Sequence, residues 1–279
     1  MLACPVRLGV GRDRRRRIGS AVVAIAAAAV ARREPPVTPR IFCPPPLAAG
    51  ARIDLPQGAA HHVLRVLRLQ PGQALTLFDG EGGEYGAAIA HVGPRVVAVD
   101  VVEYREIERE SPLTVTLAQG LAAADRMDYV VQKAVELGVA AIAPLAGARS
   151  VPRLEGARAT RRVEHWRQIA IAACEQSGRN RLPTVHAPCA FSAWLQAPSP
   201  AELRLLLAPD ARVLLADLPR PEGAVELLVG PEGGFTAEES AAACAAGFRA
   251  VRLGPRTLRT ETAGPAALAA MQALWGDWR

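Results

Sequence analysis

Two short apolar runs in the last third of the chain each end abruptly in glycine and proline. The first is Leu227–Val229, which runs into the loop 230–235, and the second is Val251–Leu253, which runs into the loop 254–259. Apolar runs with this punctuation are typical of buried strands that open into tight backbone loops. Because the two loops lie close together in the sequence, they predict a single site.

The first loop, Gly-Pro-Glu-Gly-Gly-Phe, combines glycines that allow close backbone approach with a proline that stiffens the turn. Thr236 and Glu239 then fit a capping box that starts a helix. Open α/β sheets bind ligands where a strand ends and a helix begins. A purely structural turn is the alternative. The sequence has neither a P-loop nor a strand-borne G-x-G-x-x-G, so a phosphate cradle is not predicted.

The second loop is followed by Arg259, Thr260, Glu261 and Thr262, and then by an alanine-rich helix expected over 266–275. A surface Arg/Glu pair is usually only a weak ion pair. Here a cation, two hydroxyls and a carboxylate adjoin a second glycine loop. This combination favours a functional site.

The net charge of +6 does not by itself indicate a nucleic-acid partner. Residues 1–37 hold eight arginines against two acidic residues, which accounts for the whole excess, and the remaining chain is neutral. The chain is long and apolar enough for two domains. Five cysteines without C-x-x-C spacing indicate free thiols in a reducing compartment: Cys4, Cys43, Cys174, Cys189 and Cys244.

Residues 1–37 form a basic, alanine-rich extension. Arg14–Arg17 followed by Ile18–Ala31 resembles a secretory signal, but the apolar run is too short and too rich in alanine for a membrane span. We favour the hypothesis that this extension is not native and that translation starts at Val37. We therefore expect a cytoplasmic protein.

Residues 38–110 are expected to form a small β-rich domain. Strands are predicted over 41–42, 52–55, 74–78, 85–89 and 96–102, with a hairpin loop over 79–84. One helix is predicted over 59–69, with Val63, Leu64, Val66 and Leu67 on its apolar side. Neighbouring His61 and His62 do not share a helix face, so a metal site is not predicted. Docking of a phosphate backbone, with an inert solvated surface as the alternative, is assigned to Arg40, Arg52, Arg65 and Arg68.

The acidic connector 107–112 is the predicted domain boundary. After it, strands expected over 113–118, 139–145, 203–207, 213–216 and 227–229 alternate with helices over 127–137 and 160–177. This alternation predicts a largely parallel sheet with a ligand at the carboxyl ends of its strands. A basic cluster is suited to RNA phosphates, the alternative being a solvated helix face: Arg149, Arg153, Arg158, Arg161, Arg162 and Arg167.

Six ordered blocks carry a resemblance to a known family: 39–42, 61–68, 132–138, 174–180, 230–235 and 258–263. On these blocks the chain, from Arg40 to its C-terminus, resembles the RsmE family of SPOUT-class RNA methyltransferases. Val135 departs from the family pattern, in which we expect threonine, and residues 1–37 are an extension that the family generally lacks.

The resemblance implies an α/β fold in which a PUA-like RNA-binding β-barrel (38–110) precedes a trefoil-knotted SPOUT methyltransferase domain (111–279). It further implies a homodimer that uses S-adenosylmethionine to methylate N3 of one uridine in 16S ribosomal RNA of the small subunit. The implied cofactor-binding residues are Leu228, Gly230, Pro231, Glu232, Gly233, Gly234, Leu253, Gly254, Leu258 and Thr260. RNA binding is assigned to Arg40, Arg65, Arg68, Arg149, Arg153, Arg161 and Arg162.

N3 of uracil carries a proton at neutral pH, so the site needs a base and a cation that stabilises charge on the uracil oxygens. The candidates are Glu261 or Glu175 as the base and Arg259 or Arg179 as the cation. Structural alternatives are a helix cap for Glu261 and an i,i+4 pair between Glu175 and Arg179. A ribose 2′-O-methyltransferase and a non-catalytic ribosome-assembly factor are the alternative functions.

Overall fold

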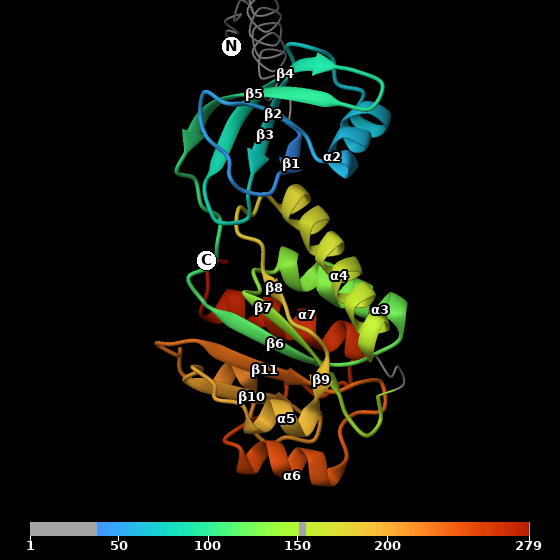
Figure 1. The fold of residues 1–279 in the computed structure, drawn as a ribbon. Helices are drawn as coiled ribbons and strands as arrows, with labels where there is room; N and C mark the ends of the chain where they lie inside the picture. Colours follow the sequence, from blue (N-terminus) through green and yellow to red (C-terminus); the bar gives the residue numbers. More distant parts are fainter. Residues whose placement is uncertain (1–37, 151–154, 279) are drawn as a thin grey trace, which may run out of the picture. The chain divides into compact units, whose positions relative to one another are not determined.

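The computed structural model describes residues 38–150 and 155–278 (Figure 1). The hypothesis about residues 1–37 lies outside this part of the chain, and so do Cys4 and Arg153. Residues from Pro39 onward form one compact unit that contains two β-sheets.

The first sheet has five strands in the order β1-β3-β4-β5-β2, with β1 and β2 at its two ends. β1 is parallel to β3, whereas the other pairs are antiparallel. All five predicted strands and the hairpin between β3 and β4 are confirmed, because each apolar run is bounded by turn residues. The bounds are β1 Arg40–Phe42, β2 Arg52–Asp54, β3 Ala74–Phe78, β4 Glu84–Val92 and β5 Val97–Arg105.

The predicted helix after β2 is present but divided. A short helix α2 (Gln57–His61) continues as a π-helical turn over His62–Leu67, and Arg68 follows with φ 53°. Val63 is buried, but Val66 is 63% exposed, so its predicted place on the apolar side is wrong. A π-helical turn rotates later side chains away from the stripe that a 3.6-residue repeat would give.

The second sheet is parallel throughout, as predicted, and its main order is β12-β10-β11-β6-β7-β8, with β9 also paired to β7. Its strands are β6 Val115–Gly120, β7 Ala141–Ala146, β8 Thr184–Val185, β9 Cys189–Ala190, β10 Leu203–Leu207, β11 Val225–Val229 and β12 Arg249–Val251. The strand predicted over 213–216 is wrong: the chain makes only an isolated bridge from Leu214 to Arg252 before the 3₁₀ turn Leu215–Asp217.

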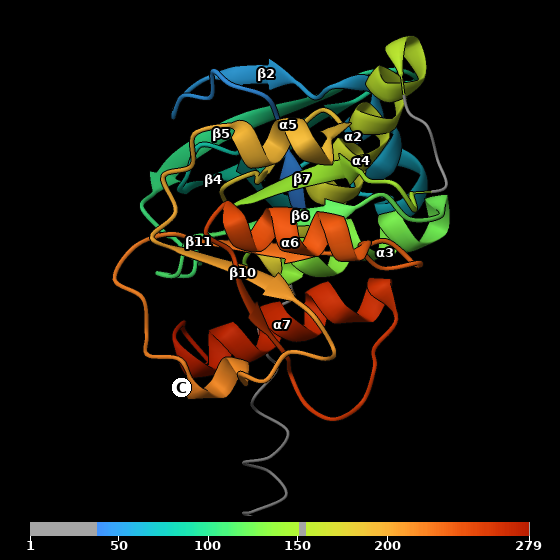
Figure 2. The same ribbon diagram turned by 90° about the horizontal axis from the view of Figure 1, so that it is seen from below.

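Helices cover both faces of the second sheet (Figures 1 and 2). Leu117 packs in a cluster with α3, α4 and α7, whereas its neighbour Ala118 packs in a second cluster with α5 and α6. This alternation is the two-residue repeat of a strand that is buried on both faces. The helices are α3 Ala124–Glu136, α4 Gly156–Ser177, α5 Phe191–Gln196, α6 Ala237–Ala245 and α7 Thr260–Leu274. The last helix begins six residues earlier than predicted.

Candidate functional site

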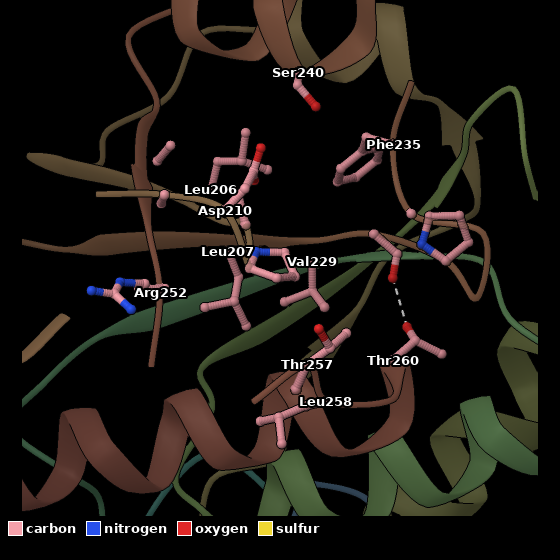
Figure 3. A pocket seen from close by; sticks show the side chains of 18 of the residues that line it. Leu206, Leu207, Asp210, Val229, Phe235, Ser240, Arg252, Thr257, Leu258 and Thr260 are labelled. Carbon is pink, nitrogen blue, oxygen red and sulfur yellow. Dashed lines mark hydrogen bonds between the residues drawn. The ribbon is translucent and has the colours of Figure 1, made fainter. Parts of the chain in front are cut away.

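A cavity of about 800 Å³ lies at the carboxyl ends of β10, β11 and β12. Its walls are the loops that follow these three strands, namely 208–211, 230–235 and 252–259. The predicted position of a binding site at the carboxyl ends of parallel strands therefore coincides with a cavity of the size that ligand pockets have. Figure 3 shows Leu207, Val229 and Leu258 among its apolar lining residues.

The loop after β11 is a tight turn followed by a capped helix. The backbone N–H of Gly234 donates to the Pro231 carbonyl over 2.9 Å, and Gly234 has a φ of +65°, which glycine adopts without strain. The Thr236 hydroxyl then accepts from the Glu239 N–H, while the Glu239 carboxylate accepts from the Thr236 N–H. The predicted capping box is confirmed.

Gly120, at the end of β6, lets this loop lie directly against the sheet. A Cβ at Gly120 would lie 2.4 Å from the backbone nitrogen of Pro231. This distance is too short for any residue that has a side chain. Sequence reasoning missed this position. Its signal is a glycine that ends an otherwise apolar strand, which marks close backbone approach.

A buried hydrogen bond joins the two glycine loops. The Thr260 hydroxyl donates to the carbonyl oxygen of Gly230 over 2.6 Å, drawn as a dashed line in Figure 3. The same hydroxyl accepts from Nε2 of Gln119 over 2.9 Å, and Gln119 is fully buried. Gln119 therefore orients the Thr260 hydroxyl toward the Gly230 carbonyl. It was not among the predicted residues.

Most of the residues predicted to bind the cofactor line this cavity. They are Gly230, Pro231, Glu232, Gly233, Gly234, Leu253, Gly254, Leu258 and Thr260. Leu228 does not: its side chain is fully buried and packs with Phe191 and Phe248 on the face covered by α5 and α6. Successive strand residues face opposite sides, so Val229, rather than Leu228, reaches the cavity.

A third wall of the cavity had no counterpart in the sequence analysis. It consists of Leu206 and Leu207 from β10 and the following loop 208–211, which includes the exposed carboxylate of Asp210. The β10 loop contains no glycine and no recognisable motif, so only the parallel order of the strands brings it beside the other two.

Of the four predicted catalytic residues, Arg259 alone lines the cavity. It is exposed and has no ion-pair partner among the described residues. Glu261 lies in the first turn of α7, and its Oε2 lies 4.0 Å from Nε of Arg126. That oxygen is buried and has no hydrogen-bond donor in the described part of the chain.

Arg179 lies away from this cavity and is 5% exposed. Its guanidinium donates to Glu110 over 3.0 Å and to the carbonyls of Val135 and Val139 over 2.9 Å each. These contacts hold the guanidinium in the scaffold, away from the cavity of its own chain, and the action of Arg179 on the uracil oxygens stays a prediction.

Glu175 also lies outside the cavity, on α4 beside β1. Its Oε1 accepts from the backbone N–H of Phe42 over 3.0 Å. Burial raises the pKa of this carboxyl, opposed by that hydrogen bond and by the charges of His62 and Arg40. Neither the predicted catalytic pair nor the i,i+4 alternative with Arg179 is observed, because each side chain has other partners.

Arg40, one of the predicted RNA-binding residues, has several partners within the chain. Its Nη1 lies 2.6 Å from Glu84, its Nη2 donates to Asn180, and the guanidinium lies over the Phe78 ring. Its side chain is 13% exposed, and its role in RNA binding stays a prediction.

The other predicted RNA-binding arginines have fewer partners within the described part of the chain. Arg65, Arg68 and Arg161 are exposed, and Arg162 lies 3.8 Å from Asp128. Arg149 lines the cavity and donates to the Gly233 carbonyl over 2.8 Å. Their role in RNA binding stays a prediction.

The described residues hold no cluster of three or more His, Cys, Asp or Glu side chains that would bind a metal. In the same part of the chain, no helix combines the length and apolar character needed to cross a membrane. Cys43, Cys174, Cys189 and Cys244 are free thiols.

Comparison with known families and structures gives the class of the protein. Residues 109–272 match an RNA methyltransferase domain, and residues 55–102 match an RNA methyltransferase PUA domain. The fold and this cavity are therefore those of an RNA methyltransferase.

Individual relatives agree. The ribosomal RNA small subunit methyltransferase E of Buchnera aphidicola (Schizaphis graminum) is 31% identical over 86% of this chain and 97% of its own length. The Mycobacterium tuberculosis protein of that name is 32% identical over 84% and 90%. A crystal structure of the Neisseria gonorrhoeae protein of that name, bound to S-adenosylmethionine, shares 41% identity over 87% of this chain and all of its own, with a TM-score of 0.81. The chain belongs to the ribosomal RNA small subunit methyltransferase E family.

The link between the loops predicts a specific cost at Thr260. Thr260→Val keeps the shape but removes the 2.6 Å donor to the Gly230 carbonyl, which keeps only a longer 3.4 Å bond from Nε2 of Gln119, and it removes one of the acceptors of that amide. We expect it to lower the free energy of unfolding by about 1–3 kcal/mol, measured by urea denaturation.

The matched control is Thr262→Val, at an exposed position in the same helical turn. It should change the free energy of unfolding by less than about 0.5 kcal/mol. Equal effects of the two variants would contradict the buried link.

Glu175 predicts a pH dependence of stability. Because its pKa in the folded state is raised by burial, its favourable contribution is complete below the ordinary glutamate pKa of about 4.3 and is lost as pH rises through the raised value. Glu175→Gln, whose amide oxygen can still accept from Phe42, should therefore be more stable than the wild type at neutral pH but not at about pH 4. Urea denaturation across this range tests it; a loss of stability at neutral pH would contradict it.

Proposed function

We propose that this chain transfers the methyl group of S-adenosylmethionine to N3 of a specific uridine in 16S ribosomal RNA of the small ribosomal subunit. The observation that carries the proposal is the cavity between the two glycine loops. Arg259 lies at its wall without an ion-pair partner in the described part of the chain, and Glu261 follows two residues further along. Family membership supports the same reaction class.

The cavity fits this cofactor. Leu207, Val229 and Leu258 provide apolar surface suited to an adenine ring, and backbone groups of the loops provide hydrogen-bonding partners. A Cβ at Gly234 or Gly254 would meet no protein atom within 4 Å, so the space beside these lining residues is free for a ligand. When bound, S-adenosylmethionine supplies a methyl group on an electrophilic sulfonium.

The protein's own residues then have to prepare the uracil. Arg259 would stabilise negative charge that develops on a uracil oxygen as the N3 proton leaves. Glu261 would accept that proton at its carboxylate, where the buried Oε2 has no other donor among the described residues. The loops would hold N3 in line with the methyl group.

The finer architecture that we propose follows from the family resemblance. The domain containing residues 111–279 would be a trefoil-knotted SPOUT domain, preceded by a PUA-like barrel over 38–110, and the protein would act as a cytoplasmic homodimer. RNA would contact the exposed arginines Arg65, Arg68, Arg149 and Arg161, together with Arg162 and with Arg153, which lies outside the described residues.

Methyl transfer tests the proposal directly. Residues 38–279 are incubated with labelled S-adenosylmethionine and small ribosomal subunits that lack N3-methyluridine, and the product nucleosides are analysed by mass spectrometry. We expect N3-methyluridine. A methylated ribose would identify a ribose 2′-O-methyltransferase instead, and cofactor binding without transfer would favour an assembly factor.

We assign the role of the base to Glu261 rather than to Glu175. Glu261→Gln should lower kcat by about 10²–10⁴-fold while the dissociation constant for S-adenosylmethionine changes little, because the amide cannot accept the proton.

Glu175→Gln, which alters a carboxylate on α4 that accepts from the Phe42 N–H, serves as the comparison and should retain most of kcat. The reverse order of the two variants would contradict the assignment. Both are measured with saturating cofactor in the methyl-transfer assay.

A further inference from the structure

Arg126 lies between two carboxylates that belong to different loops of the candidate site. Its Nη1 is 3.3 Å from Oε1 of Glu232, in the first glycine loop, and its Nε is 4.0 Å from Oε2 of Glu261, in the first turn of α7. The three residues come from segments that are far apart in the sequence: the start of α3, the loop after β11 and the start of α7.

Two groups at the start of α3 contact the Glu232 carboxylate. Besides Arg126, its Oε1 accepts from the backbone N–H of Ala123 over 2.7 Å. Ala123 is the residue that precedes α3, so the loop carboxylate sits at a helix N-terminus, where the helix dipole favours negative charge. This fixes the outer side of the first glycine loop to α3.

The position of Arg126 is not explained by its own helix. A cation in the first turn of a helix is disfavoured by the helix dipole, whereas two nearby carboxylates outweigh that effect. The side chains of Arg126, Glu232 and Glu261 are 34%, 22% and 19% exposed, so water screens this cluster less than an open surface pair. Without the guanidinium, two like charges would face each other across the gap.

Arg126 therefore complements the inner link made by Thr260 and Gly230. The inner hydrogen bond joins the backbone of the first loop to the start of α7, and the outer cluster joins the same two segments through side chains. The outer cluster consists of Arg126, Glu232 and Glu261, and Glu261 is the carboxylate that we propose as the base.

We propose that Arg126 is a positioning residue for methyl transfer, which orients the Glu261 carboxylate toward the substrate and ties it to the first glycine loop. The inference rests on the proposed function of Glu261 as the base. Arg126 does not itself line the cavity and acts through the two carboxylates, of which Glu232 is a lining residue.

The test compares Arg126→Ala and Arg126→Lys with Arg105→Ala, which removes an exposed ion pair to Glu103 within β5 of the first sheet. Arg126→Ala should lower kcat by about 10–100-fold and raise the dissociation constant for S-adenosylmethionine by about tenfold, since small misplacements of a catalytic group are costly. Arg126→Lys, which keeps the charge, should recover part of kcat. Arg105→Ala should leave both quantities unchanged.

A double variant shows whether Arg126 acts through Glu261. If it does, adding Arg126→Ala to Glu261→Gln should lower kcat little further, because the carboxylate that it positions is already gone. A purely structural role would lower kcat by the same factor in both backgrounds and would overturn the proposal.

Hydrogen exchange of the ligand-free chain gives a readout that does not depend on activity. Arg126→Ala should speed exchange in 230–235 and leave 74–78 unchanged. Unchanged exchange and unchanged kcat in this variant would overturn the inference while the proposed function stands. If the wild-type chain transfers no methyl group to uridine N3, the proposed function fails, and the role of Arg126 in methyl transfer fails with it. Faster exchange in 230–235 of Arg126→Ala would still show that Arg126 holds the first glycine loop.

Discussion

The hydrogen bond from Thr260 to the Gly230 carbonyl is the contact on which the candidate site depends. It closes two loops that follow different strands, and Gln119 supports it from the neighbouring strand β6. The bond can form only because β11 lies beside β6 in the parallel order and because Gly120 has no side chain to hold the loop away. A buried donor and acceptor without each other would be costly, so sheet order, glycine and threonine stabilise one arrangement.

Two arginines outside the candidate site, Arg179 and Arg40, stabilise the scaffold. Arg179 clamps Glu110 and two carbonyls at the end of α3, and Arg40 joins β1 to Asn180 after α4. Most donors of these two arginines have partners within the chain, so the side chains serve the scaffold. Arg259 lines the cavity and has no ion-pair partner among the described residues, so the two predicted cations differ in their surroundings, a distinction that residue type alone does not make.

Sequence patterns sufficed wherever a local rule decides the structure. All the predicted strands except 213–216 are present, Thr236 and Glu239 form the capping box, and both glycine loops line one cavity. The patterns failed where a tertiary partner decides. Gln119, Arg126 and the loop 208–211 carry no local signal, and their roles arise from strand order. Val66 was misplaced because a π-helical turn interrupts the expected repeat.

The central claim is that the two glycine loops form one binding site for S-adenosylmethionine. Hydrogen exchange of the full chain with and without this cofactor tests the claim most directly. We predict that amides in 230–235 and 252–260 become protected together. Amides in 179–183, a segment that lines a second and smaller cavity, should not change. Protection confined to one loop, or centred on 179–183, would contradict it.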